Sequence, residues 1–350
     1  MKSLLADEIM EVVGKEAPDR VMLLTDSNVA IIESGLIGLL QKRLQSYRPE
    51  VIVTPAGEEN KTLTALENIL SFMSGAGMTR RSMLICIGGG MVTDIGGFAA
   101  AVFKRGIRHL NVATTLLGAV DASVGGKTAI DFRGLKNEIG AFHLPVAVLA
   151  DAGSFGSLPH SEILSGFGEV IKTALISDEK MTRRFLAVDP ADADAAILDE
   201  ACRFCRREKM RIVEADPTEK GLRKVLNFGH TAGHAIESLL IEKGQGLPHG
   251  TAIAHGNLVA LILSHLKEGM DKKWISEYAH WLRRNYPPAQ FTCSDYDRLW
   301  TLATHDKKNR DAGHLAYTLI SAPGSPVYDR PISRDDLYAA LDIYQELLGR

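Results

Sequence analysis

Cysteine is scarce in this 350-residue chain, which contains only Cys86, Cys202, Cys205 and Cys293. Four cysteines in a chain of this length do not form a disulfide framework, so we expect a reducing compartment. Cys202 and Cys205 have CxxC spacing, but they lie in a highly charged stretch with helical periodicity, and no second CxxC pair accompanies them. We therefore interpret this pair as incidental and not as a redox or zinc site.

The chain also lacks an excess of basic residues, since its formal net charge is −3. Nucleic acids and membrane surfaces require a broad basic field, so the sequence argues against both as partners. The longest apolar stretch, residues 252–266, is interrupted by His255, Asn257 and His265 and is too short to cross a bilayer. Residues 1–14 carry three acidic side chains where a secretory signal would be basic and then apolar. We expect a cytoplasmic protein.

Alternating strand and helix patterns occupy the first 150 residues. Short apolar runs predict buried parallel strands at 21–26, 51–55, 83–87, 109–112 and 147–151. An apolar stripe with helical spacing covers residues 63–73 and ends at Gly75 and Gly77. Strands that alternate with helices in this way predict an open α/β domain with a parallel sheet.

Helical periodicity dominates the second half of the chain. Residues 161–176, 191–214, 256–267 and 274–284 have this pattern with no clear strands between them, and 333–348 reads as a closing helix capped near Ser333 or Asp335. We therefore predict an α/β domain over residues 1–151 and an all-α domain over 152–350. The cleft between two such domains is a natural place for a binding site.

Histidines with metal-ligand spacing stand out in this half. His230 and His234 share one face of a predicted helix, and His249 supplies a third imidazole. Glu169 offers a carboxylate on another amphipathic segment, and three such N/O donors suit a catalytic zinc. The glycines that flank the histidines allow a ligand or another backbone to approach closely. The alternative is a pair of ordinary surface or core histidines, with Glu169 a solvated helix charge.

A glycine triplet follows the third predicted strand. Gly88, Gly89 and Gly90 lead into a helical pattern with Asp94 in its first turns, and glycines at such a junction let a pyrophosphate contact backbone N–H groups at a helix N-terminus. The triplet lacks the GxGxxG spacing, so a tight strand-to-helix turn explains it about equally well.

Cations, hydroxyls and glycines are interleaved over residues 104–106, 114–117, 121–128 and 135–137, which we expect to be loops. The Gly126-Lys127-Thr128 sequence is not a Walker A loop, because the first glycine of that motif would fall at position 121, which is Asp. The lysines and arginines gathered here instead fit a phosphorylated substrate, since charge-assisted bonds to phosphate are strong.

Six motifs in register resemble the 3-dehydroquinate synthase family, from about Thr25 to Lys308. They are Gly88-Gly89-Gly90 with Asp94, residues 114–117, residues 121–128, residues 136–142, residues 169–172, and Asn227-x-Gly229-His230-x-x-Gly233-His234. The resemblance implies an N-terminal NAD-binding α/β domain with a Rossmann-like parallel sheet, a C-terminal helical domain and a homodimer.

The resemblance also implies a role for individual residues. Glu169, His230 and His249 are the expected ligands of a zinc or cobalt ion, whereas His234 is expected to contact substrate and not metal. The expected NAD contacts are Asp26, Glu58, Lys61, Gly89, Gly90, Asp94, Thr114 and Thr115, with Lys127 and Lys136 nearby. The expected catalytic and substrate-binding residues are Arg105, Asp121, Lys127, Lys136, Asn137, Lys172, Lys209, Arg223, Asn227, His234 and one or both of Lys307 and Lys308.

The activity that the resemblance implies converts 3-deoxy-D-arabino-heptulosonate 7-phosphate to 3-dehydroquinate and phosphate. NAD would oxidise one alcohol transiently, phosphate would leave by β-elimination, and re-reduction and an intramolecular aldol step would follow. Thr93 and Gly168 depart from residues that are usual in the family, but neither departure removes a ligand. Related sugar phosphate cyclases alter the substrate contacts, whereas Arg223, Asn227 and His234 here follow the dehydroquinate pattern. The alternatives are a sister cyclase, a metal-dependent polyol or glycerol dehydrogenase, and a catalytically silent NAD-binding module.

Overall fold

The structure is a computed structural model that describes residues 2–133, 135–304 and 314–349. Two compact units make up the chain. Unit 1 comprises Met1–Leu158 and Leu198–Arg206, and unit 2 comprises Pro159–Ile197 and Arg207–Arg350.

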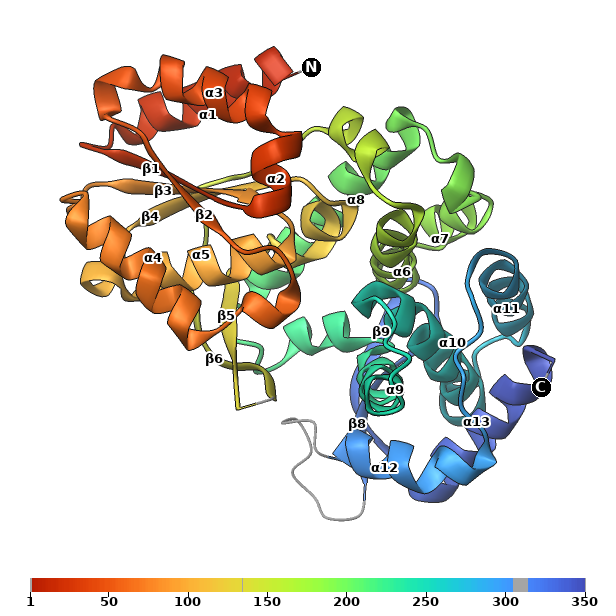
Figure 1. Cartoon of the computed structure of the whole chain (residues 1–350). Coiled ribbons are helices and arrows are strands. Elements are labelled where there is room, and N and C mark those ends of the chain that lie inside the picture. The colour runs from red at the N-terminus through yellow and green to blue at the C-terminus, as the bar shows by residue number, and fades with distance from the viewer. Residues whose placement is uncertain (1, 134, 305–313, 350) are drawn as a thin grey trace. The chain divides into compact units, whose positions relative to one another are not determined.

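A five-stranded parallel sheet with strand order β2-β1-β3-β4-β7 forms the centre of unit 1 (Figure 1). Its strands are β1 (Val21–Asp26), β2 (Glu50–Thr54), β3 (Met83–Gly88), β4 (Arg108–Ala113) and β7 (Val148–Ala150). Every residue of β1 and β3 is buried, as expected for parallel strands that are covered on both faces. All five predicted strands are confirmed.

Helices cover both faces of this sheet (Figure 1). They are α1 (Lys2–Glu16), α2 (Ser27–Ile32), α3 (Ser34–Arg43), α4 (Leu63–Gly75) and α5 (Gly90–Val102). Successive residues of a strand point to opposite faces, and accordingly Leu23 packs in the cluster that includes Leu36 of α3, whereas Leu24 packs with Ile69 of α4 and Ile95 of α5. The predicted helix at residues 63–73 is confirmed.

An antiparallel hairpin stands where the sequence predicts loops. Strands β5 (Lys127–Phe132) and β6 (Leu135–Phe142) pair from Lys127↔Phe142 onward. The prediction of loops at 127–128 and 135–137 is therefore wrong. It failed because most of β6 is exposed and lacks the apolar alternation that marks a half-buried strand.

Unit 2 is mostly helical, as predicted. Its helices are α6 (His160–Ser177), α7 (Glu179–Leu186), α9 (His230–Glu242), α10 (His249–Glu268), α11 (Lys273–Asn285), α12 (Tyr296–Thr304) and α13 (Arg334–Leu347), while α8 (Ala195–Ala215) contributes to both units. Ser333 caps α13 in a capping box with Asp336, which confirms the predicted cap.

Unit 2 also contains a hairpin that the all-α prediction omits, formed by β8 (Leu315–Ala322) and β9 (Ser325–Ile332). Pro326 and Pro331 interrupt β9 and weaken its strand signal. Short helical turns complete the described chain at Gln45–Tyr47, Glu58–Asn60, Phe103–Arg105, Gly118–Ala122, Ala152–Ser157, Pro190–Asp192, Leu222–Asn227 and Cys293–Asp295.

Glycines bring the backbones of α6, α9 and α10 into direct contact. A Cβ atom at Gly168 of α6 would lie 2.0 Å from the carbonyl oxygen of Gly250 in α10. A Cβ atom at Gly256 of α10 would lie 2.1 Å from the carbonyl oxygen of Gly229 and 2.6 Å from the amide nitrogen of Gly233. These separations exclude any side chain, so the close approach that the sequence predicts beside the histidines is an approach by another backbone.

All four cysteines are free. Cys202 and Cys205 are buried on α8, and burial raises the pKa of the Cys202 thiol to about 12. A thiol with such a pKa has little of the thiolate that redox or metal chemistry requires. Within the described part of the chain, no helix is long and apolar enough to cross a membrane.

We predict that Gly256→Ala destabilises the protein by at least about 1–3 kcal/mol, because the added methyl group meets backbone atoms that cannot move aside. Gly38→Ala in α3 is the matched control, since a Cβ atom there would contact nothing within 4 Å. Because Gly38 lies in a helix interior, Gly38→Ala should stabilise the protein by up to about 1 kcal/mol. Urea unfolding of both variants measures the difference, and equal stabilities would contradict the packing argument.

A second prediction concerns His109, which is buried on β4 and stacks on His143 with ring centroids 5.0 Å apart. Neither ring nitrogen of His109 has a hydrogen-bond partner among the described residues. Burial, together with the nearby His143, lowers the pKa of His109 to about 3. The unfolded chain, in which this pKa is about 6.5, therefore binds a proton that the folded chain does not between these two pH values.

The free energy of unfolding should consequently fall as the pH drops below about 6.5, by at most about 1.4 kcal/mol per pH unit from this residue. His109→Leu should remove this contribution and flatten the profile. Denaturant unfolding at several pH values between 7 and 5 is the measurement, and parallel profiles for the two proteins would disprove the assignment.

Candidate metal and nucleotide sites

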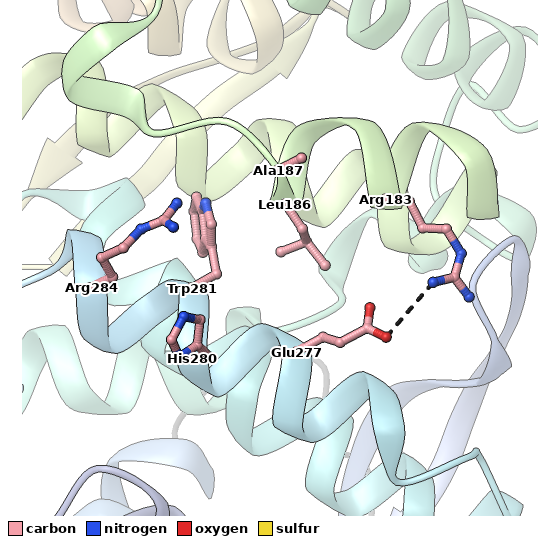
Figure 2. Close-up of a pocket in the computed structure, with 7 residues that line it drawn as sticks. All are labelled: Arg183, Leu186, Ala187, Glu277, His280, Trp281 and Arg284. Atoms are coloured by element: carbon pink, nitrogen blue, oxygen red, sulfur yellow. Dashed lines mark ion pairs between the residues drawn. The ribbon is translucent and has the colours of Figure 1, made fainter.

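A surface pocket between α7 and α11 contains none of the predicted site residues (Figure 2). Its lining is Arg183, Leu186, Ala187, Glu277, His280, Trp281 and Arg284. Arg183 pairs with Glu277 at 3.7 Å and lies over the ring of Trp274 at 4.5 Å from its centroid. These contacts join two helices, and we interpret the pocket as a structural feature of their packing.

The three predicted metal ligands converge from three helices. Glu169 lies in the middle of α6, His230 is the first residue of α9, and His249 is the first residue of α10. The Nε2 atoms of His230 and His249 lie 3.5 and 3.6 Å from the same atom, Oε1 of Glu169. The glycine contacts among α6, α9 and α10 explain how donors so distant in sequence come together.

His234 belongs to the same cluster. Ring nitrogens of His230, His234 and His249 lie within 4.8 Å of one another, and the ring of His234 is 5.2 Å from that of His230 between centroids. This geometry is compatible with either role for His234, as a metal ligand or as a substrate contact. Its assignment to substrate stays a prediction.

The chemistry of these donors fits a divalent metal ion. Glu169 is completely buried, and its Oε1 has no hydrogen-bond partner in the described part of the chain. A buried carboxylate oxygen without a partner is costly, and a cation beside it would remove that cost. Lys172 Nζ lies 2.5 Å from the other oxygen, Oε2, and forms a buried ion pair. One carboxylate and two imidazoles is a donor set that zinc accepts in catalytic sites.

The histidine rings are held in orientations that leave Nε2 facing Glu169. His230 Nδ1 lies 3.1 Å from the carbonyl oxygen of Phe228, and His249 Nδ1 lies 3.2 Å from Oε2 of Glu237. Burial by itself lowers the pKa of His249, but the carboxylates of Glu169 and Glu237 outweigh burial and raise it to about 10. Such a pKa indicates a strongly negative potential, which favours a bound cation.

The predicted nucleotide residues gather at the carboxyl ends of neighbouring strands in unit 1. Gly89 caps the N-terminus of α5 without a side-chain hydrogen bond, and Gly118 N–H donates to Thr115 Oγ1 at 3.0 Å. Thr114 N–H donates to the carbonyl of Gly88 at 3.0 Å, which joins the ends of β3 and β4. Ligands of parallel α/β sheets bind at this edge. The helix dipole also gives the N-terminus of α5 a partial positive charge.

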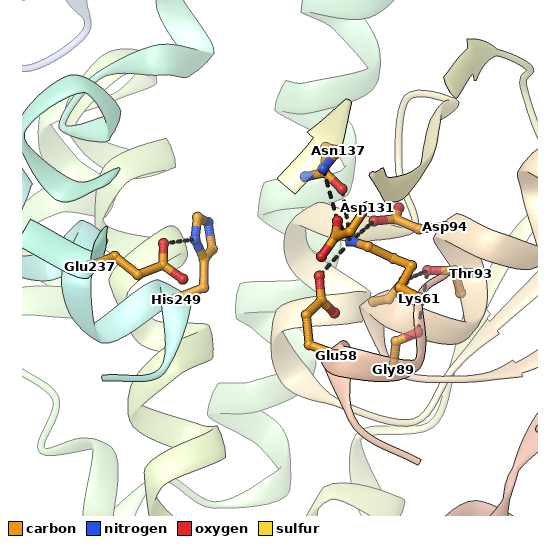
Figure 3. Close-up of polar contacts among 10 residues, drawn as sticks. Glu58, Lys61, Gly89, Thr93, Asp94, Asp131, Asn137, Glu237 and His249 are labelled. Atoms are coloured by element: carbon orange, nitrogen blue, oxygen red, sulfur yellow. Dashed lines mark hydrogen bonds and ion pairs between the residues drawn. The ribbon is translucent and has the colours of Figure 1, made fainter. Parts of the chain in front are cut away.

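A buried lysine connects several of the predicted NAD and substrate residues (Figure 3). Lys61 is 2% exposed, and its Nζ lies 2.5 Å from Glu58 Oε1, 3.2 Å from Asp94 Oδ2 and 2.7 Å from Asn137 Oδ1. Burial lowers the pKa of Lys61, but the carboxylates of Asp94 and Glu58 outweigh burial and raise it. The lysine is therefore charged, and it fixes three predicted residues around itself.

Two residues of these networks are absent from the sequence prediction. Asp131 on β5 accepts a hydrogen bond from the backbone N–H of Asn137 at 2.8 Å and lies 3.8 Å from Lys61 Nζ. Glu237 is the partner of His249 described above. Asp131 lies just outside the motif of residues 121–128 and had no signal of its own, whereas Glu237 follows His230 and His234 at helical spacing and was recognisable on that ground.

Other predicted residues of unit 1 occupy loops, turns and the hairpin. Asp26 caps α2, because its Oδ1 accepts hydrogen bonds from the backbone N–H groups of Asn28 and Val29, each at 2.9 Å. Arg105 is exposed and has a left-handed backbone with φ 67°. Asp121 lies in the Gly118–Ala122 turn, and exposed Lys127 and Lys136 lie on β5 and β6.

The remaining predicted residues belong to unit 2. Lys209 is buried on α8, and Arg223 is buried in the Leu222–Asn227 turn, where its Nη1 donates to the carbonyl of Pro217 at 2.7 Å. Asn227 Nδ2 donates to Glu219 Oε1 at 2.7 Å. Lys307 and Lys308 lie outside the described residues.

Solved structures of similar fold bind a nucleotide and a metal. A 2-deoxy-scyllo-inosose synthase complexed with carbaglucose-6-phosphate, NAD⁺ and Co²⁺ superposes with a TM-score of 0.84 at 24% identity, over 98% of this chain and 94% of that one. A 2-epi-5-epi-valiolone synthase from Streptomyces hygroscopicus subsp. jinggangensis 5008, with NAD⁺ and Zn²⁺ bound, superposes with a TM-score of 0.79 at 22% identity, over 94% and 92%. At these identities the likeness shows a common fold.

Closer relatives are found by sequence. The 3-dehydroquinate synthase of Parabacteroides distasonis is 38% identical over 345 residues, which cover 99% of this chain and 97% of that protein. That of Listeria monocytogenes serotype 4b is 37% identical over 320 residues, which cover 91% and 85%. Residues 51–165 match the family model of the 3-dehydroquinate synthase N-terminal domain, and residues 166–309 match that of its C-terminal domain. The chain therefore belongs to the 3-dehydroquinate synthase family.

Proposed function

We propose that the protein converts 3-deoxy-D-arabino-heptulosonate 7-phosphate to 3-dehydroquinate and phosphate, a carbon–oxygen lyase reaction of the shikimate pathway. Family membership over almost the whole chain supports the activity. The observation that links this activity to particular residues is the convergence of His230 and His249 on one oxygen of buried Glu169, which has no hydrogen-bond partner among the described residues. We propose these three residues as the ligands of a zinc or cobalt ion.

NAD is the second cofactor of the proposal. Its proposed contacts are Asp26, Glu58, Lys61, Gly89, Gly90, Asp94, Thr114, Thr115, Lys127 and Lys136, which all belong to unit 1. The glycine end of α5 supports this choice, since backbone N–H groups at a helix N-terminus can hold the anionic phosphates of a nucleotide. The carboxylates of Glu58 and Asp94, which Lys61 holds in place, can accept hydrogen bonds from the hydroxyl groups of the nucleotide. When bound, NAD supplies reversible hydride transfer and the metal ion supplies Lewis acidity.

The chain's own residues would hold the substrate and its charges. Arginine and lysine side chains bind phosphate and carboxylate strongly, and their fixed positions lower the cost of orienting the substrate. Arg223 is already fixed by burial and by its hydrogen bond to the carbonyl oxygen of Pro217, and Lys172 is fixed by its ion pair with Glu169. The proposed substrate set is Arg105, Asp121, Lys127, Lys136, Asn137, Lys172, Lys209, Arg223, Asn227, His234, Lys307 and Lys308.

The alternative of a polyol dehydrogenase is less well supported. The glycerol dehydrogenase of Schizosaccharomyces pombe shares the fold with a TM-score of 0.62, but its identity to this chain is 14%. A polyol substrate also carries no phosphate, and so gives no reason for the many proposed lysine and arginine contacts. We further propose a cytoplasmic homodimer, which the family resemblance and the four free cysteines support.

The purified protein should release phosphate from the deoxy sugar acid phosphate with NAD present in only catalytic amounts, because each turnover regenerates the NAD that it uses. Phosphate release and the absorbance of NADH are the two measurements. Stoichiometric accumulation of NADH would indicate a dehydrogenase. Turnover of sedoheptulose 7-phosphate without turnover of the deoxy sugar acid would indicate a sister cyclase.

A comparison of His249→Ala with His234→Ala tests whether His249 is a metal ligand and His234 a substrate contact. We expect His249→Ala to lose bound metal, because one of three ligands is gone. We expect His234→Ala to retain metal and to lose about 100-fold or more in turnover, as is typical when a positioned polar group is removed. Metal content by elemental analysis is the deciding measurement, and equal metal loss in both variants would make His234 a ligand.

A further inference from the structure

A buried carboxylate on α9, that of Glu237, contacts one of the proposed metal ligands. Glu237 follows His230 by seven residues and His234 by three, so the three side chains share one helix face. Glu237 is 4% exposed, and its Oε2 lies 3.2 Å from Nδ1 of His249. Figure 3 shows the carboxylate directed at the His249 ring.

We propose that Glu237 is a positioning residue for the metal ligand His249. An ionised carboxylate only accepts hydrogen bonds, so this contact keeps a proton on Nδ1 and makes Nε2 the nitrogen that binds a metal ion once the ion displaces the Nε2 proton. Nε2 is the atom that lies 3.6 Å from Glu169 Oε1. Glu237 thereby selects the tautomer and the ring orientation that a metal ion needs. The inference rests on the metal site of the proposed function.

The two histidines of this site are supported in different ways. His230 Nδ1 faces a neutral acceptor, the carbonyl oxygen of Phe228, whereas His249 Nδ1 faces the carboxylate of Glu237. Bonds to a charged acceptor are stronger, and a carboxylate partner makes an imidazole a better donor to metal. Removal of Glu237 should therefore weaken the metal site through His249 and leave the support of His230 intact.

A purely structural role for Glu237 makes a different prediction. A carboxylate at this depth is costly unless it is paired, so its removal alters the stability of the fold in either case. Only the positioning role also requires a change in metal affinity. The test must therefore measure metal binding by folded apoprotein, separately from activity and from stability.

The experiment compares Glu237→Gln and Glu237→Ala with wild type. Zn²⁺ and Co²⁺ affinities of each apoprotein are measured by competition with a chromogenic chelator, and the visible spectrum of the Co²⁺ form is recorded. We expect the affinity of Glu237→Ala to fall about 10–100-fold, as is usual when the partner of a ligating histidine is lost. We expect about a 10-fold loss in Glu237→Gln, because a neutral amide binds the Nδ1 proton less strongly.

Glu242→Gln is the matched control. Glu242 lies on the same helix but is exposed and paired with Arg298 through Oε2, 3.0 Å from Nε. Its replacement should leave metal affinity and the Co²⁺ spectrum at the wild-type values. A loss in this variant equal to that of Glu237→Gln would overturn the inference, because it would be a general effect of removing charge from α9.

Glu237→Gln preserves the size of the side chain and carries the test even where Glu237→Ala fails to fold. Wild-type metal affinity in folded Glu237→Gln would overturn the positioning role while leaving the metal site in place. Failure of wild-type apoprotein itself to bind Zn²⁺ or Co²⁺ would instead refute the proposed metal site, and the inference with it.

Discussion

The close contact among α6, α9 and α10 is the constraint on which the proposed metal site depends. At Gly168, Gly250 and Gly256, backbone atoms from a neighbouring helix occupy the space that a side chain would need. Helices that approach so closely hold residues at their contact in fixed relation, since packed backbones have few alternative arrangements. Glu169 and the first residues of α9 and α10 are thereby held within a few ångströms of one another.

Buried charge in both units is balanced by specific partners. In unit 1, Lys61 is surrounded by the oxygens of Glu58, Asp94 and Asn137. In unit 2, one oxygen of Glu169 pairs with Lys172, while the other has no hydrogen-bond partner among the residues described. A buried charge is tolerated only when it is paired or binds a metal. The same physical rule thus supports a structural lysine network in one unit and a cation site in the other.

Prediction from sequence succeeded where the local pattern was strong. The five buried strands have continuous apolar runs, and the helix at 63–73 has a regular stripe, so neither needs distant contacts to be recognised. The hairpin of β5 and β6 was missed because exposed polar strands have no such pattern, and β9 was obscured by two prolines. Asp131 was missed because it acts on groups from other elements. Helical spacing places Glu237 beside His230 and His234, but its contact with His249 on α10 depends on the fold.

The sequence by itself determined the family, the order of the sheet strands along the chain, and the residue types that metal and phosphate chemistry need. Only the tertiary structure decided the geometry in which those residues meet. Spacing alone pairs His230 with His234, whereas the folded chain also brings His249 and Glu169 to the same point. The physical reason is that contacts between distant segments depend on how closely helices pack, and here that distance is set by glycines whose effect is visible only when the opposing backbone is present.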